Sequence, residues 1–163
     1  MLRTACETVV RFDDQLERLV EDLYATMYAE DGVGLAANQI GVGLRVFVYD
    51  CPDDDDVRHL GHLVNPVLVE ADGVSVRGEE GCLSLPGLRA ATPRWDRALV
   101  RGQDLTGAEV EVEGTGFFAR CLQHESDHLD GGVFLQRLSG LRRLRAERGA
   151  RRAEWYREAA PLG

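Results

Sequence analysis

Residues 115–132 read TGFFARCLQHESDHLDGG, and this segment decides the fold. Thr115 can cap a helix, apolar residues follow at helical spacing, and two glycines stop the helix at its end. Within it, His124 and His128 are four residues apart, so both imidazoles project from one face and can reach a single ion. Glu125 follows the first histidine, where its carboxylate can take a proton from a metal-bound water. The segment predicts a metal-binding helix; the alternative is a polar helix face with solvated side chains.

Two histidines do not complete a metal site, so the remaining histidines and cysteines are candidates for a third ligand. One protease pattern continues as HExxHxxGxxH, but Phe134 stands at its last position and cannot bind a metal. His59 and His62 flank an acidic loop and are interpreted as surface or strand-end residues. Cys121 lies seven residues from His128, roughly 10 Å along a helix axis, whereas metal–ligand bonds are about 2.0–2.3 Å. Cys121 is therefore interpreted as a small buried hydrophobe.

Cys82 stands in a different setting, the stretch EEGCLSLPG at residues 79–87. Glycines and a proline bracket this short apolar piece, which favours an extended strand that enters a turn and can lay its backbone beside a ligand. The alternative for this cysteine is a buried structural thiol.

A third stretch, EDGVGLAANQIGV at residues 30–42, gathers small residues around one glutamine. Gly32 and Gly34 permit close backbone approach, and the side-chain amide of Gln39 can donate to an oxyanion. Taken alone, the two glycines could be only a helix stop and a turn. They are no dinucleotide-binding fingerprint, because no strand precedes them.

Taken together and in this order, GVGLAANQ at 32–39, EGCLS at 80–84 and QHESDH at 123–128 closely resemble the three motifs of peptide deformylase. The resemblance extends from about residue 16 to residue 141. It implies hydrolysis of the N-formyl group of formylmethionyl peptides on nascent chains, with release of formate.

The resemblance also implies the roles of the site residues. Cys82, His124 and His128 would bind one divalent metal ion, most often Fe²⁺, with Zn²⁺ or Ni²⁺ able to occupy the same site. Glu125 would act as general base and acid, and Gln39 with the backbone N–H of Leu83 would stabilise the oxyanion. The substrate-binding residues would be Val33, Gly34, Gly87, Arg89, Phe117, Arg120 and Cys121. Arg120 replaces the apolar residue more typical there, so the methionine pocket stays apolar only if this arginine bends outward to solvent.

Two other functions fit parts of the pattern. A zinc endopeptidase would need a different third ligand, and no downstream glutamate helix is evident to supply one. A metal-stabilised binding protein without catalytic activity would have a closed site with four protein ligands and no open position.

The patterning predicts an α+β fold in which antiparallel sheets pack around a central metal-binding HExxH helix. A helix beginning at Asp13 or Asp14 is expected from apolar residues at helical spacing: Leu16, Leu19, Val20, Leu23 and Met27. Strands are expected at residues 44–49, 63–69, 74–77, 98–104 and 108–113. The acidic residues 53–56 form a loop, and a solvated tip is favoured there over a calcium site.

Composition is that of a cytoplasmic enzyme. With 163 residues and 44% hydrophobic content, one catalytic domain over residues 1–163 is expected. The first ten residues lack the apolar run of a signal peptide and no stretch is apolar enough to span a bilayer, so no membrane partner is expected. Four cysteines without a disulfide-like framework fit a reducing compartment.

Charge divides the chain into two parts, and every basic residue is arginine. Residues 1–136 carry a formal charge of −14 and residues 137–163 carry +5. Ser139 could cap an Arg-rich helix that runs to about Glu158, with Leu141, Leu144 and Trp155 placed to contact the body. The arginines either pair with the acidic domain or contact ribosomal RNA, since arginine suits phosphate. No DNA partner is expected.

Overall fold

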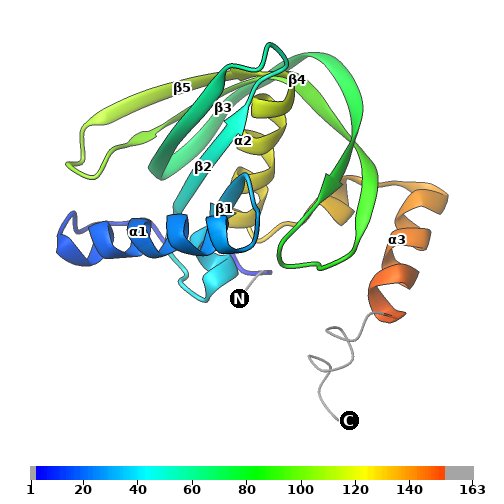
Figure 1. Ribbon diagram of the computed structural model, residues 1–163, viewed down its shortest axis with the longest axis horizontal. Coiled ribbons are helices and arrows are strands. Elements are labelled where there is room, and N and C mark those ends of the chain that lie inside the picture. Colours follow the sequence, from blue (N-terminus) through cyan, green and yellow to red (C-terminus); the bar gives the residue numbers. More distant parts are fainter. Residues whose placement is uncertain (1–2, 153–163) are drawn as a thin grey trace, which may run out of the picture.

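The structure is a computed structural model and describes residues 3–152, which form three α-helices, two short 3₁₀ helices and five strands. In chain order these are α1 (Asp14–Ala29), β1 (Gly34–Ala36), η1 (Ala37–Ile40), β2 (Val46–Pro52), β3 (Arg58–Gly81), β4 (Arg89–Gln103), β5 (Glu109–Thr115), α2 (Gly116–Leu129), η2 (Phe134–Arg137) and α3 (Gly140–Arg152). Helices α1 and α3 lie at opposite ends of the molecule (Figure 1). The expected α+β class is confirmed.

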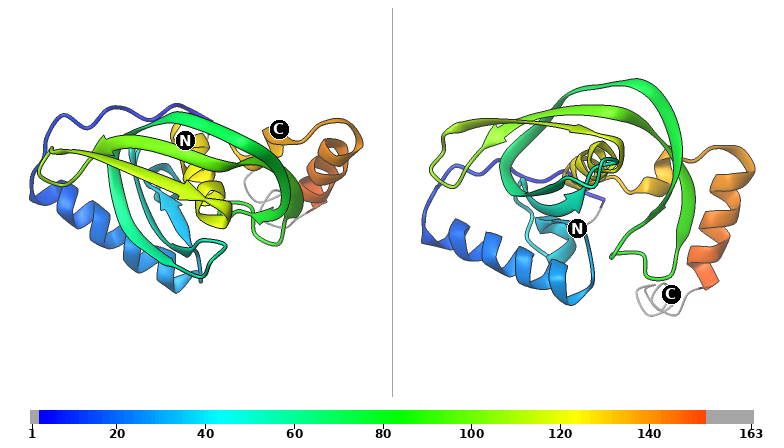
Figure 2. Two further views of the ribbon diagram at one scale, coloured as in Figure 1. Left: turned by 90° about the horizontal axis from the view of Figure 1, so that it is seen from above. Right: turned by 45° about the horizontal axis from the view of Figure 1, so that its top comes forward.

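The described strands join in a single antiparallel sheet in the order β1-β2-β3-β4-β5, where several sheets were expected. Because each strand pairs with the next along the chain, the sheet is a simple meander. Beyond α2, β3 and β4 continue as a curved paired ribbon that ends at a turn near α3 (Figure 2). Cys82 directly follows the end of this ribbon, so it lies far from the beginning of β3.

Strand β3 is one element where the sequence predicted two. The pairing register shifts between Asp72 and Ser75, and Gly73 adopts a left-handed φ of 84°. Across the bulge, Asp96 accepts a hydrogen bond from the backbone N–H of Val74 at 2.8 Å. A β-bulge absorbs extra residues while the strand continues, so the break in the pattern bends the strand without ending it. Strand β4 likewise begins nine residues before the predicted start, because the lengthened β3 gives it a partner.

Strand β2 lies between two helices, which explains its continuous apolar run. Phe47 and Tyr49 pack in the cluster around α2, whereas Val46 and Val48 pack in the cluster around α1. Since successive side chains of a strand point to opposite faces, both faces of β2 are buried.

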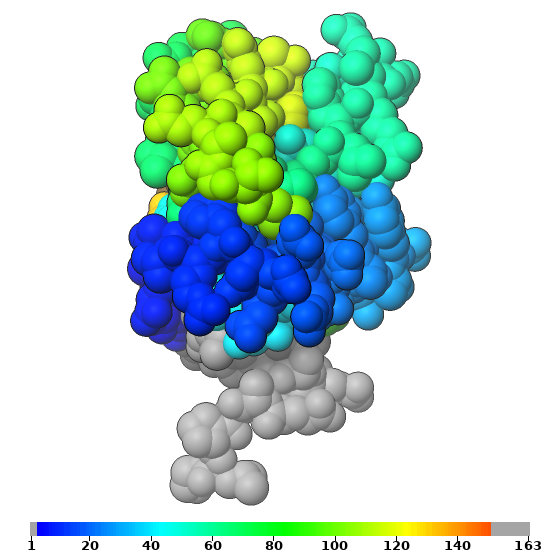
Figure 3. Space-filling model, turned by 90° about the vertical axis from the view of Figure 1, so that its left-hand side faces the viewer, coloured from blue at the N-terminus to red at the C-terminus, as the bar shows by residue number. Residues whose placement is uncertain are grey.

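Helix α1 has the boundary and the buried stripe that its sequence predicts. Asp13 caps the helix by accepting hydrogen bonds from the backbone N–H groups of Gln15 and Leu16. The buried residues are Leu16, Val20, Leu23 and Met27, and Leu19 is half-buried. From the α1 side, the N-terminal segment and α1 lie together below β4 and β5 (Figure 3).

Helix α2 contacts all five strands and is almost wholly buried beyond its first turn. Thr115 occupies the N-cap position, but the first turn is capped by the acidic loop, where Asp54 accepts a hydrogen bond from the backbone N–H of Phe117 at 2.9 Å. The helix stops as predicted, with Gly131 at a left-handed φ of 77°. A Cβ on that glycine would also lie 2.9 Å from the backbone of Thr4. Both ends of this helix are thus fixed by contacts with distant segments.

Helix α3 begins directly after Ser139, as predicted, and its predicted extension to Glu158, with Trp155, lies outside the described residues. Leu141 and Leu144, which were predicted to contact the body, are 71% and 43% exposed, so neither is a buried anchor of the helix. Ala146 and Ala150 are buried instead. No helix in the described part of the chain is long and apolar enough to cross a membrane.

Candidate metal centre

Three metal-binding side chains converge where the end of β3 meets α2. His128 Nε2 lies 3.1 Å from Cys82 Sγ and 3.1 Å from His124 Nε2. His128 is fully buried, and Cys82 and His124 are nearly so. Atoms this close can bind one ion at the usual bond lengths of about 2.0–2.3 Å. Among the described residues these three form the one group of donors close enough to share an ion.

The electrostatics of the three donors favour a positive charge between them. Burial lowers the pKa of His128 to about 3, which keeps that imidazole neutral and its Nε2 lone pair available. Burial also acts to lower the pKa of His124, but hydrogen bonds with Cys82 and Glu80 outweigh it and raise that pKa to about 10. A metal cation would supply the positive charge that the proton supplies here, so the donor set fits a divalent ion.

Glu80 fixes the orientation of His124. Its Oε1 accepts a hydrogen bond from Nδ1 of His124, which leaves Nε2 directed at the other two donors. Arg94 binds both carboxylate oxygens of Glu80, at 2.7 and 3.1 Å, and Arg120 binds Oε2 at 3.1 Å. Burial acts to raise the pKa of Glu80, but the hydrogen bonds from His124 and Arg94 lower it to about 2, so the group is a carboxylate.

This ion-pair network continues through α2 to η2. Arg94, whose side chain is 1% exposed, also binds Asp127 at 2.6 Å, and Asp127 binds Arg137 through both carboxylate oxygens. Burial acts to raise the pKa of Asp127, but hydrogen bonds and charge from Arg137 and Arg94 outweigh it, and the pKa is lowered. Arg94 lies outside the three motifs, and no sequence pattern indicates it. Glu80 and Asp127 stand within motifs, and that position is the signal in the sequence that could identify them.

Glu125 is buried beside the metal donors with one oxygen unused. Its Oε2 has no hydrogen-bond partner among the described residues, and burial raises its pKa to about 7. A Cβ on Gly34 would lie 2.5 Å from Oε1, so only glycine lets β1 approach this carboxylate. A carboxyl group with this pKa can both accept and release a proton near neutral pH.

Gln39 presents its amide nitrogen to the metal donors. Its Oε1 accepts a hydrogen bond from the backbone N–H of Ala36 at 2.9 Å, which fixes the amide plane. Its Nε2 then lies 3.6 Å from Cys82 Sγ and 3.1 Å from Ser84 Oγ. Leu83 lies between these two residues in the turn after β3. The predicted oxyanion donors thus come from η1 and from this turn.

A cleft of about 470 Å³ opens onto these residues. Every residue predicted to bind substrate lines it: Val33, Gly34, Gly87, Arg89, Phe117, Arg120 and Cys121. Gln39, Cys82, Leu83, His124 and Glu125 line it as well, whereas His128 lies behind it. The structure therefore brings all the predicted site residues to one place.

Arg120 lines the cleft as predicted, but its guanidinium lies inside the protein. It does not bend outward to solvent, since the residue is 8% exposed and its guanidinium turns inward to Glu80. It also donates to the backbone oxygens of Thr92 and Val76, each at 2.9 Å. The aliphatic stem of Arg120 therefore lines the cleft, and Glu80 neutralises the charge of its guanidinium beneath the cleft.

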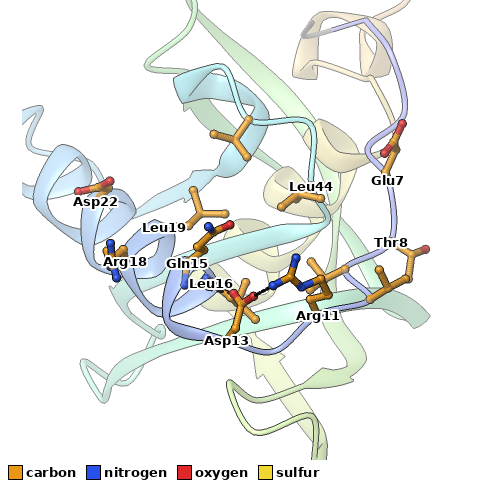
Figure 4. Close-up of a pocket in the computed structure, with 13 residues that line it drawn as sticks. Glu7, Thr8, Arg11, Asp13, Gln15, Leu16, Arg18, Leu19, Asp22 and Leu44 are labelled. Carbon is orange, nitrogen blue, oxygen red and sulfur yellow. Dashed lines mark hydrogen bonds and ion pairs between the residues drawn. The ribbon is translucent and has the colours of Figure 1, made fainter.

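A second hollow, of about 560 Å³, lies between the N-terminal segment and α1 (Figure 4). Arg11 and Asp13 form an ion pair at 2.9 Å on its wall. Its lining contains no histidine or cysteine, so it lacks the donors that make the first cleft a candidate for catalysis.

Comparison with known proteins finds strong similarity over nearly the whole chain. The family described as "Polypeptide deformylase" matches residues 1–144. "Peptide deformylase 2" of Streptomyces avermitilis is 65% identical over 161 residues, covering 99% of this chain and 87% of that protein. The crystal structure of peptide deformylase from Ehrlichia chaffeensis in complex with actinonin has a TM-score of 0.85 at 37% identity, covering 94% of this chain and 91% of that one. The peptide deformylase of Thermus thermophilus has a TM-score of 0.81 at 41% identity, covering 91% and 88%.

Proposed function

The chain belongs to the peptide deformylase family, and we propose that Cys82, His124 and His128 hold its single divalent metal ion with Glu125 as the base. The reaction is hydrolysis of the N-formyl group on the N-terminal formylmethionine of nascent polypeptides, which releases formate. The observation that carries our assignment of residues is the meeting of three donors beside one cleft, next to Glu125, whose Oε2 has no hydrogen-bond partner among the described residues.

Three residues near the metal donors take part in the proposed reaction: Glu125, Gln39 and Leu83. The metal ion, when bound, would act as a Lewis acid and lower the pKa of water towards about 7. Glu125 accepts the proton of the attacking water at Oε2 and returns it to the nitrogen of the leaving amine. Gln39 Nε2 and the backbone N–H of Leu83 donate to the developing oxyanion, typically worth about 2.7–4 kcal/mol for each donor.

The cleft would bind the formylmethionyl peptide. Gly34 lets the substrate backbone approach Glu125, and the turn from Gly87 to Arg89 offers an exposed edge beside β4. Val33, Phe117 and Cys121 contribute apolar surface for the methionine side chain, with the stem of Arg120 beside them. Actinonin, which binds the Ehrlichia enzyme, would occupy this cleft.

The native ion in this proposal is Fe²⁺, with Zn²⁺ or Ni²⁺ able to replace it. One thiolate and two imidazoles suit all three metals. A thiolate ligand persists in a reducing compartment, which supports a cytoplasmic location. We also propose that residues 1–163 form one catalytic domain. The four cysteines are all free thiols.

Incubation of the purified protein, loaded with Ni²⁺, with formyl-Met-Ala-Ser tests the proposal directly. We expect release of formate and one tightly held metal ion per chain. Absence of formate release from protein that holds one ion would contradict it.

We further propose that the arginines of α3 contact ribosomal RNA near emerging nascent chains. Arg142, Arg145 and Arg148 are exposed and make no ion pair within residues 3–152, whereas Arg143 pairs with Glu147 at 2.8 Å. Exposed arginines of this kind suit phosphate through bidentate, salt-sensitive contacts. No acidic side chain among the described residues pairs with these three arginines, so each is available to a phosphate.

Charge neutralisation tests this contact more cleanly than truncation, since Gly149 of α3 lies against Leu88 of the cleft turn. Replacing Arg142, Arg145 and Arg148 by Gln should weaken co-sedimentation with ribosomes at low salt and leave tripeptide deformylation nearly intact. Arg143→Gln, at a residue already paired, is the matched control. Undiminished ribosome binding by the triple variant would rule the contact out.

A further inference from the structure

Arg120 stands at a position that touches both the cleft and the metal-ligand network. We propose that it is a positioning residue, which holds the Glu80 carboxylate against the sheet and thereby fixes His124 for the metal ion. The inference rests on the proposed metal site. It assigns a role to a side chain that the sequence placed only in the substrate pocket.

The contacts of Arg120 tie α2 to two strands at once. Its Nη1 donates to Glu80 Oε2 and to the backbone oxygen of Thr92 in β4, and its Nη2 donates to the backbone oxygen of Val76 in β3. Gly78 makes room for this guanidinium, because a Cβ there would lie 2.9 Å from Nη2. The guanidinium is planar and its donors are fixed on separate nitrogens, so it holds three acceptors in one geometry, whereas the donors of an ammonium rotate on a single nitrogen.

Arg120 provides an anchor that Arg94, the other arginine bound to Glu80, lacks. Arg94 is shared between Glu80 and Asp127, and Asp127 is itself bound by Arg137. A shift of that chain of ion pairs would move Arg94 and Glu80 together. Arg120, in contrast, is bonded to backbone oxygens of paired strands, so it fixes Glu80 Oε2 relative to the sheet.

The position of Arg120 on α2 links this anchor to the metal ligand. Arg120 lies four residues before His124, so both side chains project from the same face of the helix. Both contact the same carboxylate, Arg120 at Oε2 and His124 at Oε1. Removing the guanidinium would leave Glu80 free to tilt about its bonds to Arg94, and the imidazole would tilt with it.

The experiment measures nickel release from the full chain to a colorimetric chelator. Arg120→Met keeps an unbranched stem beside the cleft and removes the guanidinium, so nickel should leave about 10–100-fold faster. Arg120→Lys should release nickel at an intermediate rate, because the single nitrogen of an ammonium cannot reproduce contacts that arginine makes from both Nη1 and Nη2. Arg97→Met, at an arginine that pairs with Glu113 on the outer sheet face, is the matched control and should match wild type.

The outcomes separate this inference from the proposed function. Equal nickel release by wild type and Arg120→Met would overturn the role of Arg120 alone. If Arg120→Met fails to fold, Arg120→Lys decides, and a wild-type release rate would overturn the inference. Wild-type protein that retains no nickel would overturn the metal site itself.

Discussion

Replacing Glu80 with Gln should destabilise the protein strongly, because it removes the charge at the centre of the buried network. The carboxylate accepts two hydrogen bonds from Arg94 and one from Arg120, and Arg94 and Glu80 are 1% and 5% exposed. Glutamine keeps one acceptor oxygen, but its N–H₂ group would face the N–H donors of the two arginines. Breaking a buried ion pair by removing one partner typically costs about 3–5 kcal/mol, since the remaining charge is left uncompensated.

For a chain of this size that cost corresponds to a fall in Tm of roughly 6–20 °C. The assay is urea and thermal unfolding of metal-free protein, which separates the network from metal binding. Glu79→Gln is the matched control, since the neighbouring glutamate pairs with Arg89 at 3.3 Å with both side chains about two-thirds exposed or more. Its cost should stay below about 1 kcal/mol. Equal effects of the two substitutions would refute the reasoning.

Three further predictions concern the ligands, the pH dependence and the ion. Cys82→Ala should lose the metal while Cys121→Ala keeps one ion per chain by elemental analysis, and equal loss would contradict the ligand set. Hydrogen bonds from Arg58 and Tyr28 lower the pKa of Asp50 from 3.8 to about 2, so its stabilisation is present above about pH 4 and is lost as pH falls through about 2. Asp50→Asn should therefore cost under about 1 kcal/mol at neutral pH, because Arg58 is 66% exposed, and the difference in unfolding free energy from wild type should shrink in acid; a constant difference would contradict this. Activity of the iron form should decay in air faster than that of the nickel form, as Fe²⁺ and the thiolate oxidise, and identical half-lives would argue against oxidation.

The elements predicted from sequence are those set by local spacing. The stripe of α1, the two histidines on α2 and the stop at Gly131 depend on residues within a few turns of one another, and the structure has them. The glycines around Gln39 and Cys82 also predicted close approach. Gly34 shows why, because Glu125 fills the space that a side chain would take.

What the sequence could not show depends on distant partners. The inward course of Arg120 is set by Glu80, 40 residues earlier, and by carbonyl groups of two strands. The continuity of β3 depends on Asp96, which supports the bulge from β4. Asp54 resembles part of a solvated acidic loop, yet it caps α2 from 63 residues away. No periodicity within one segment carries such information.

The most direct test of the account is the turnover of Glu125→Gln. The amide has nearly the same shape and can occupy the space beside Gly34, but it cannot carry the proton from water to the leaving amine. We expect the variant to hold one metal ion per chain and to release formate about 10²–10⁴-fold more slowly at saturating formyl-Met-Ala-Ser. A metal-loaded variant with the wild-type kcat would contradict the assignment of Glu125 as the base.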